Sequence, residues 1–209
     1  MRYDTDFLYL KSGGIFLETS KLELLLAGTR IIPSVNSAEG LKCVLTKTSL
    51  PCVMLKLGDI NTLPKIIRLI HQYGRKAVVH QDSIKGLARD RTSIDFLSRL
   101  GADAVVTMKP QCVRWIKEEE MLSILGLFLI DTNALATGIQ SINESRPDAG
   151  LVMPMTIPGS IYEAILRQIR VPLLAGGLGM EEALVTAALD NGALAAAVTK
   201  PALWQTIGS

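Results

Sequence analysis

The chain has 209 residues, of which 48% are hydrophobic, 20% are charged and 5% are aromatic. This length suits one large domain with a full core, or two small ones. The aliphatic content excludes a disordered chain, and the charged fraction excludes a bundle of membrane helices. The longest nearly apolar run, at residues 121–130, is far shorter than the roughly 20 residues that a membrane-spanning helix needs.

The N-terminus and the rarer residue types narrow the class further. Two acidic residues lie within the first six, which is not typical of a signal peptide, so we expect a cytoplasmic protein with no membrane partner. Three widely spaced cysteines do not indicate a disulfide framework. With two histidines in the chain we expect no metal site, and we expect no cofactor.

Positive charge is concentrated in one stretch. The formal net charge is +2, but residues 65–99 contain eight basic and three acidic residues, a local net charge of +5. Such a stretch is usually a set of solvated helix faces. It can also form a patch for a phosphate-bearing partner. The residues that we then expect to contact RNA are Arg75, Lys76, Arg89 and Arg91.

Residues 1–29 come first and do not follow the pattern of the rest. Gly13-Gly14 divides them, and Thr19-Ser20 is a capping signal for a short helix that ends near Gly28. We expect an N-terminal extension over residues 1–29, followed by a single domain over residues 30–209.

Eight short aliphatic or β-branched runs follow, and each predicts a strand. They lie at residues 30–35, 51–57, 76–80, 104–107, 124–130, 150–153, 172–175 and 194–199. Because the runs are continuously apolar rather than alternating, we expect a parallel sheet that is covered by helices on its faces. Eight strands favour a compact α/β fold, a closed (β/α)8 TIM-like barrel with short helices. A doubly wound sheet with fewer strands is the alternative.

Apolar residues at helical spacing separate these runs. Residues 36–39 and 160–163 resemble capping boxes and predict two helix starts. Three glycines follow the last apolar residue of a helical segment and precede a predicted strand. Glycine readily takes the left-handed conformation that ends a helix, so each predicts a helix C-terminus. They are Gly74, Gly101 and Gly192.

Two loops near the end of the chain predict a phosphate site. Gly176-Gly177 follows the seventh strand and precedes a helix start, and Thr199 follows the eighth strand. Glycines at such a place let backbone N–H groups approach an anion, and in barrels the loops after strands seven and eight often bind phosphate. The alternative is a tight turn that needs glycine for its conformation alone.

The densest polar cluster is His80-Gln81-Asp82-Ser83-Ile84-Lys85-Gly86-Leu87, directly after the third strand. An acid–base role would use Asp82 with Lys85, as in a lysine aldolase. In a binding role, Asp82 accepts hydrogen bonds from hydroxyls and Lys85 holds an anion. A histidine at a barrel mouth can also be no more than a well hydrogen-bonded residue. We expect a binding site without a catalytic residue. Its ligand residues are His80, Asp82, Lys85, Lys109, Asp131, Gly176, Gly177 and Thr199.

Residues 80–87 closely resemble the H-x-D-x-I-K-G-L segment of the glycerol-3-phosphate-responsive antiterminators, also called glycerol uptake operon antiterminator regulatory proteins. The resemblance covers about residues 30–204, while residues 1–29 have no counterpart in it. One turn departs from the family pattern, because Lys56-Leu57-Gly58 stands where an acidic residue usually precedes the glycine. The further matching segments are residues 103–109, 127–135, 146–149, 172–178 and 198–204.

This resemblance implies a barrel-like regulator with glycerol 3-phosphate as its effector. It also implies a leader mRNA of glycerol-utilisation genes as the second partner, on which the protein suppresses termination. The eight expected ligand residues match motif positions of the family. A homo-oligomer is compatible with the sequence.

Two other classes of function stay open. A phospho-sugar barrel enzyme of the aldolase or isomerase class would use the same phosphate pocket, but it needs an acid–base pair poised near neutral pH. A ligand-binding protein that acts on a protein partner is the third class. The sequence has no RNP, KH or zinc-knuckle signature and few aromatic residues for base stacking. The basic stretch at residues 65–99 is therefore what points to RNA.

Overall fold

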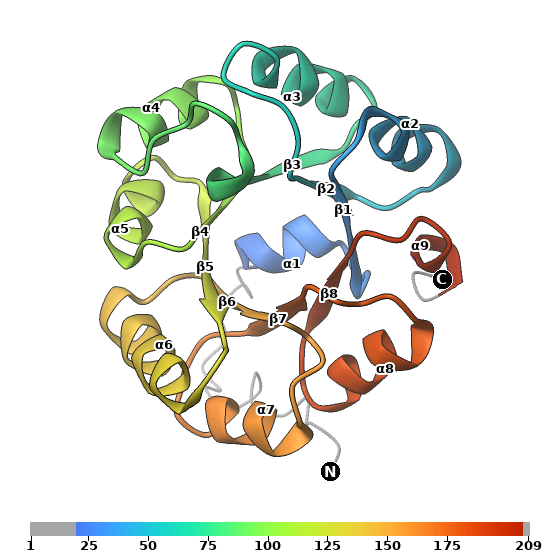
Figure 1. The fold of residues 1–209 in the computed structure, drawn as a ribbon. Coiled ribbons are helices and arrows are strands. Elements are labelled where there is room, and N and C mark those ends of the chain that lie inside the picture. Colours follow the sequence, from blue (N-terminus) through green and yellow to red (C-terminus); the bar gives the residue numbers. More distant parts are fainter. Residues whose placement is uncertain (1–19, 207–209) are drawn as a thin grey trace, which may run out of the picture.

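The computed structural model describes residues 20–206. In this part of the chain, eight parallel strands close a barrel in sequence order, from β1 to β8 and back to β1. Figure 1 looks along the barrel axis, with the helices as an outer ring. The closed (β/α)8 barrel that the sequence predicts is confirmed, and the doubly wound alternative is wrong.

Helices and strands alternate along the described chain. The strands are β1 (Ile31–Val35), β2 (Cys52–Leu55), β3 (Lys76–His80), β4 (Ala104–Thr107), β5 (Leu122–Phe128), β6 (Ala149–Met153), β7 (Leu173–Gly176) and β8 (Ala195–Val198). The helices are α1 (Lys21–Leu26), α2 (Ala38–Lys47), α3 (Leu63–Gln72), α4 (Arg91–Arg99), α5 (Pro110–Glu118), α6 (Thr132–Ser145), α7 (Gly159–Leu166), α8 (Glu182–Asp190) and α9 (Leu203–Thr206), with a 3₁₀ turn at Gln81–Ser83.

Each predicted strand overlaps an observed one, and the largest shift is at β5. The apolar pattern predicts residues 124–130, but β5 begins at Leu122 and ends at Phe128. The apolar pattern misses the start of β5 because Ser123 is a polar residue. Its side chain is nevertheless fully buried, and its hydroxyl donates to Asp148 Oδ2 at 2.6 Å. At the other end, Ile130 is apolar but lies beyond the strand and is 74% exposed.

The three glycines predicted to end helices are confirmed, whereas the two predicted capping boxes are wrong. Gly74, Gly101 and Gly192 have φ values of 70°, 80° and 103°, the left-handed conformation that closes a helix. Helix α2 is capped by Ser37, whose Oγ accepts from Gly40 N at 3.1 Å, and not by Asn36. Helix α7 begins after Pro158 without a side-chain cap, so the predicted signal at residues 160–163 lies inside the helix.

Helix α1 forms from the last part of the predicted N-terminal extension. Ser20 and Glu23 make a reciprocal capping box, in which Ser20 Oγ accepts from Glu23 N at 3.1 Å and Ser20 N donates to Glu23 Oε2 at 2.7 Å. This is the helix that Thr19-Ser20 predicts, and it ends just before Gly28. Residues 1–19, which make up most of the predicted extension, lie outside the described residues.

The barrel interior is closed at its amino end by α1. Leu22, Leu25 and Leu26 are buried in one apolar cluster with inward-facing strand residues such as Ile32 and Val78. In Figure 1, α1 lies across the centre of the ring. The strands follow one another counter-clockwise in this view, which for right-handed β-α-β connections is the view onto their carboxyl ends. The carboxyl end is therefore the open mouth of the barrel.

Side chains alternate between the barrel interior and the layer under the helices, as the period of two in a strand requires. Along β2, Cys52 and Met54 belong to the interior cluster, whereas Val53 and Leu55 belong to the outer one. The same alternation runs along the other strands and decides which residues beyond their ends turn toward the mouth.

Candidate functional site

Lys56, His80, Gly176 and Thr199 are among the residues that the alternation brings to the inner side of the mouth. Lys56 lies two places after Met54, and His80 lies two places after Val78. Gly176 pairs with Ala197 between β7 and β8, and Thr199 follows Ala197 by two places. The carboxyl ends of four strands therefore supply a cation, an imidazole, a glycine loop and a hydroxyl to one opening.

His80 is buried at the end of β3, with 6% of its surface exposed. Its Nδ1 lies 3.0 Å from the hydroxyl of Ser83. Burial first, and then the neighbouring charge of Lys56, lower the pKa of His80 to about 4, while Asp82 opposes this effect. The imidazole is therefore neutral near pH 7, and its ring nitrogens are suited to hydrogen bonding.

Lys56 is the residue of the mouth that our sequence-based site omits. All other lysines in the described range are exposed, but Lys56 is half-buried. Burial lowers its pKa. No carboxylate oxygen of the described residues lies within 4.0 Å of its Nζ. Its place at the end of a strand is visible in the sequence, and the period of two, counted onward from Met54, is the further signal that assigns it to the inner side of the mouth.

Asp82 already has two partners within the protein. Its Oδ2 accepts from Met108 N at 2.9 Å, and its Oδ1 pairs with Arg89 Nε. These contacts tie the loop after β3 to the loop after β4. Asp82 lies beside His80, and its side chain is 11% exposed.

The other charged residues of the predicted ligand site also lie at the carboxyl end of the barrel, but not on the inner side of the mouth. Lys85 is exposed, and its backbone joins the loop after β2, with Lys85 N donating to Gly58 O at 3.1 Å. Lys109 and Asp131 are exposed N-cap residues of α5 and α6. Asp131 Oδ1 accepts from Ala134 N at 2.7 Å.

The glycine loop after β7 has the unusual backbone that its sequence suggests. Gly177 has a φ of 73°, and Leu178 after it has a φ of 58°, a conformation that costs a non-glycine residue of order 1 kcal/mol or more. Gly177 O accepts from Met155 N at 3.1 Å. Lys200 Nζ donates to Met180 O at 3.1 Å, which joins the loops after β7 and β8.

The four basic residues predicted to contact RNA lie at two different ends of the barrel. Arg75 and Lys76 stand at the amino end of β3, where Arg75 donates to Thr48 and Leu50 carbonyls and Lys76 pairs with Asp103 at 2.9 Å. Arg89 and Arg91 lie near the carboxyl end of that strand. Arg91 is held by three carboxylates, those of Asp95, Glu118 and Glu119.

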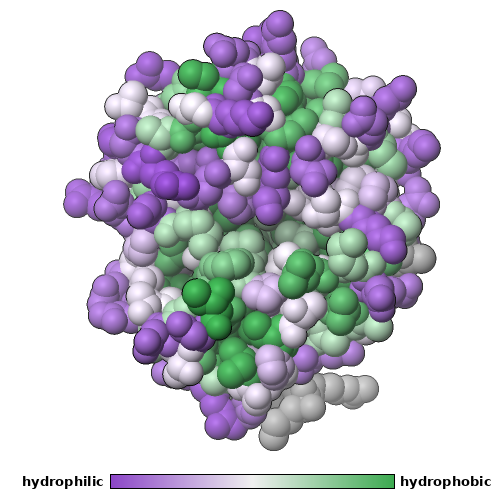
Figure 2. All heavy atoms as spheres, in the orientation of Figure 1, coloured by the Kyte–Doolittle hydropathy of each residue, from purple (hydrophilic) through white to green (hydrophobic). Residues whose placement is uncertain are grey.

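Large apolar side chains surround part of the mouth. Phe128 at the end of β5 and Ile130 after it are 60% and 74% exposed, and Leu178 and Met180 after β7 are 63% and 61% exposed. Figure 2 shows hydrophobic residues gathered over the middle and lower part of this face, with hydrophilic ones above. The mouth is thus apolar on the side of β5–β7.

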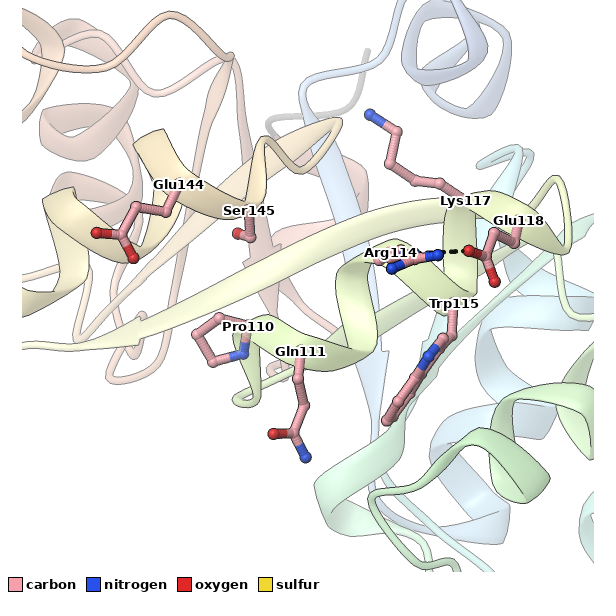
Figure 3. Close-up of a pocket in the computed structure, with 8 residues that line it drawn as sticks. All are labelled: Pro110, Gln111, Arg114, Trp115, Lys117, Glu118, Glu144 and Ser145. Atoms are coloured by element: carbon pink, nitrogen blue, oxygen red, sulfur yellow. Dashed lines mark hydrogen bonds and ion pairs between the residues drawn. The ribbon is translucent and has the colours of Figure 1, made fainter.

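One surface hollow lies on the flank of the barrel, away from the mouth. It measures about 740 Å³ and lies between α5 and α6. Figure 3 shows its lining, in which Arg114 Nε pairs with Glu118 Oε1 at 2.7 Å. Lys117 donates to Arg146 O at 3.0 Å. Its charges are mixed and mutually paired, so it does not resemble an anion site.

Between residues 20 and 206, no helix is long and apolar enough to cross a membrane. In the same range, no group of three His, Cys, Asp or Glu side chains is placed to hold a metal ion.

Comparison with known proteins agrees with the resemblance seen in the sequence. The protein "Uncharacterized protein YgcP" of Escherichia coli K12 is 27% identical over 148 residues, which are 70% of this chain and 77% of that protein. The glycerol uptake operon antiterminator regulatory protein of Listeria monocytogenes is similar in structure, with a TM-score of 0.80, 25% identity, and coverage of 86% of this chain and 96% of that one. An antiterminator-related protein of Thermotoga maritima shares the fold, with a TM-score of 0.75 at 22% identity and coverage of 85% and 99%.

The sequence profile described as "Glycerol-3-phosphate responsive antiterminator" matches residues 31–204, which includes all eight strands and every residue of the mouth. This chain belongs to the glycerol-3-phosphate responsive antiterminator family.

Proposed function

We propose that this protein is a cytoplasmic regulator that binds glycerol 3-phosphate in the barrel mouth and then binds a leader mRNA to suppress termination. The observation that carries the proposal is the convergence of the glycine loop, Thr199 and His80 at one opening, in a chain of this family. A regulatory role also suits a mouth whose histidine stays neutral near pH 7.

In this proposal the phosphate group lies against Gly176, Gly177 and the Thr199 hydroxyl, where glycine permits close approach of backbone N–H groups. The glycerol end extends toward His80. Asp82 lies beside His80, and in this proposal its bonds to Met108 N and Arg89 connect the ligand to the rim.

The proposed RNA contact lies at the rim of the mouth, where Arg89 pairs with Asp82. Arg89 is half-exposed on the rim, and the exposed Lys85 and Lys109 lie on loops of the same face. Basic residues at one edge concentrate positive charge for a polyanion, although the whole chain carries only +2. We propose Arg89 and Arg91 as the nucleus of this surface. The amino-end residues Arg75 and Lys76 would form a separate contact.

Calorimetric titration with glycerol 3-phosphate tests the ligand step. Gly177→Val should weaken binding by about tenfold or more, because a side chain enters the space of the anion and the positive φ is strained. Gly74→Val is the matched control, since Gly74 has a φ of 70° and nothing within 4 Å of a built Cβ, but lies at the amino end. Equal affinity in folded Gly177→Val protein would contradict the proposed phosphate position.

A further inference from the structure

We infer that Lys56, together with His80, forms a second anion subsite across the mouth from the glycine loop, and that it takes the carboxylate of a phosphorylated hydroxy acid. This inference rests on the proposed phosphate position at Gly176 and Gly177. It extends the ligand class of the mouth from a polyol phosphate to a three-carbon acid phosphate.

The position of the two residues follows from the order of the strands. β3 lies four strands from β7 in a closed ring of eight, which is the opposite side of the barrel, and β2 is its neighbour. Strands about 4.8 Å apart and tilted by about 36° close a barrel about 15 Å across. A lysine side chain from one wall leaves room for a three-carbon ligand that reaches the loop on the other wall.

The charge of Lys56 has no carboxylate partner among residues 20–206. It is half-buried, and no described carboxylate oxygen lies within 4.0 Å of its Nζ. A cation that is partly removed from water loses part of its favourable hydration free energy, and without a counter-charge no ion pair compensates for that loss. A ligand carboxylate would supply that counter-charge with charge-assisted hydrogen bonds, and a glycerol hydroxyl would not.

The carboxylate of Asp82, on this side of the mouth, is held by partners within the protein, and its side chain is only 11% exposed. Both oxygens of Asp82 have partners, at Met108 N and Arg89. Asp131 does not lie on the inner side of the mouth, and it caps α6. The groups that remain available to a ligand on this side of the mouth are the ammonium group of Lys56 and the neutral imidazole of His80. Both favour a hydrogen-bond acceptor on the ligand.

Calorimetric titrations with D-3-phosphoglycerate, glycerol 3-phosphate and inorganic phosphate test the inference. The wild-type protein should bind the acid phosphate at least about tenfold more tightly than glycerol 3-phosphate. Lys56→Gln should remove that preference, weakening phosphoglycerate about 30-fold and glycerol 3-phosphate less than about threefold. Lys42→Gln on the outer face of α2 is the control for a lost exposed charge and should change neither.

Each remaining outcome separates this inference from the proposed function. Binding of glycerol 3-phosphate without binding of phosphoglycerate would overturn the carboxylate subsite and leave the proposed function in place. Equal weakening of all three ligands by Lys56→Gln would mean that Lys56 holds the phosphate, which also overturns the subsite. Binding of none of the three by wild-type protein would contradict the proposed function itself.

Discussion

Asp82 and Arg89 form an ion pair across the loop after β3, and the other oxygen of Asp82 accepts from Met108 N at 2.9 Å. Because Arg89 is half-exposed, water screens its charge and the pair should contribute less than about 1 kcal/mol. The bond to Met108 N is more shielded. We expect Arg89→Ala to cost under about 1 kcal/mol of unfolding free energy and Asp82→Ala about 2 kcal/mol. Denaturant unfolding measures both, and similar losses would show that the ion pair dominates.

Helix α1 should contribute to the stability of the whole barrel. Leu25 is 4% exposed and packs inside the barrel, whereas Leu24 beside it is 62% exposed. Leu25→Ala should cost about 2–5 kcal/mol of unfolding free energy, and Leu24→Ala less than about 0.5 kcal/mol. Chemical denaturation of the full chain is the measurement. A loss for Leu25→Ala as small as that for Leu24→Ala would show that α1 does not close the amino end.

Stability should fall with acid because of His80. Its pKa is about 4 in the folded protein against an ordinary value of 6.5. Below pH 6.5 the unfolded chain takes up a proton that the folded protein does not, so stability is full above pH 6.5 and is lost as the pH falls toward 4. The loss at this residue should reach about 3 kcal/mol. In urea unfolding between pH 7.5 and 4.5, His80→Gln should lose less stability than the wild type, and parallel losses would refute this.

Removing the unpaired charge in the mouth should stabilise the free protein. Lys56→Met keeps the length of the side chain and removes a half-buried cation that has no carboxylate within 4.0 Å in the described part of the chain. We expect a gain of about 0.5–1.5 kcal/mol in the absence of ligand, as is common when a binding residue is replaced by an apolar one. Thermal unfolding of ligand-free protein would show it. A loss of stability would mean that Lys56 has a favourable partner.

Much of the fold could be predicted from the sequence because its signals are local. The continuous apolar runs indicate parallel strands, and Gly74, Gly101 and Gly192 end helices where the pattern places them. The shift at β5 could not be predicted, because Ser123 reads as polar until its bond to Asp148 is known.

The site was predictable only in part. Strand-end position identifies His80 and the glycine loop, since the carboxyl edge is where barrels bind ligands. The pairing of Asp82 with Arg89 and Met108 N depends on how neighbouring loops meet, which no local pattern contains. The same holds for the basic residues, because β3 separates Arg75 and Lys76 from Arg89 and Arg91 by its full length.

The salt dependence of RNA binding should identify the basic surface. Replacing Arg89 by Gln should flatten the log–log salt slope of leader binding by about 0.7 if Arg89 makes one phosphate contact with single-stranded RNA. Arg99→Gln is the control, because Arg99 is a basic residue of the same stretch that lines a hollow on the flank between α3 and α4. Equal slopes for Arg89→Gln and wild type would place the RNA contact elsewhere.

The central claim is that glycerol 3-phosphate controls binding of a leader mRNA, and fluorescence anisotropy of a labelled terminator-bearing leader tests it most directly. Titrations with and without glycerol 3-phosphate, at one fixed salt concentration, should show at least about tenfold tighter RNA binding with the effector. The Arg89→Glu, Arg91→Glu double variant should lose RNA binding while its affinity for glycerol 3-phosphate stays within about threefold. Identical RNA affinity of the wild-type protein with and without the effector would contradict the account.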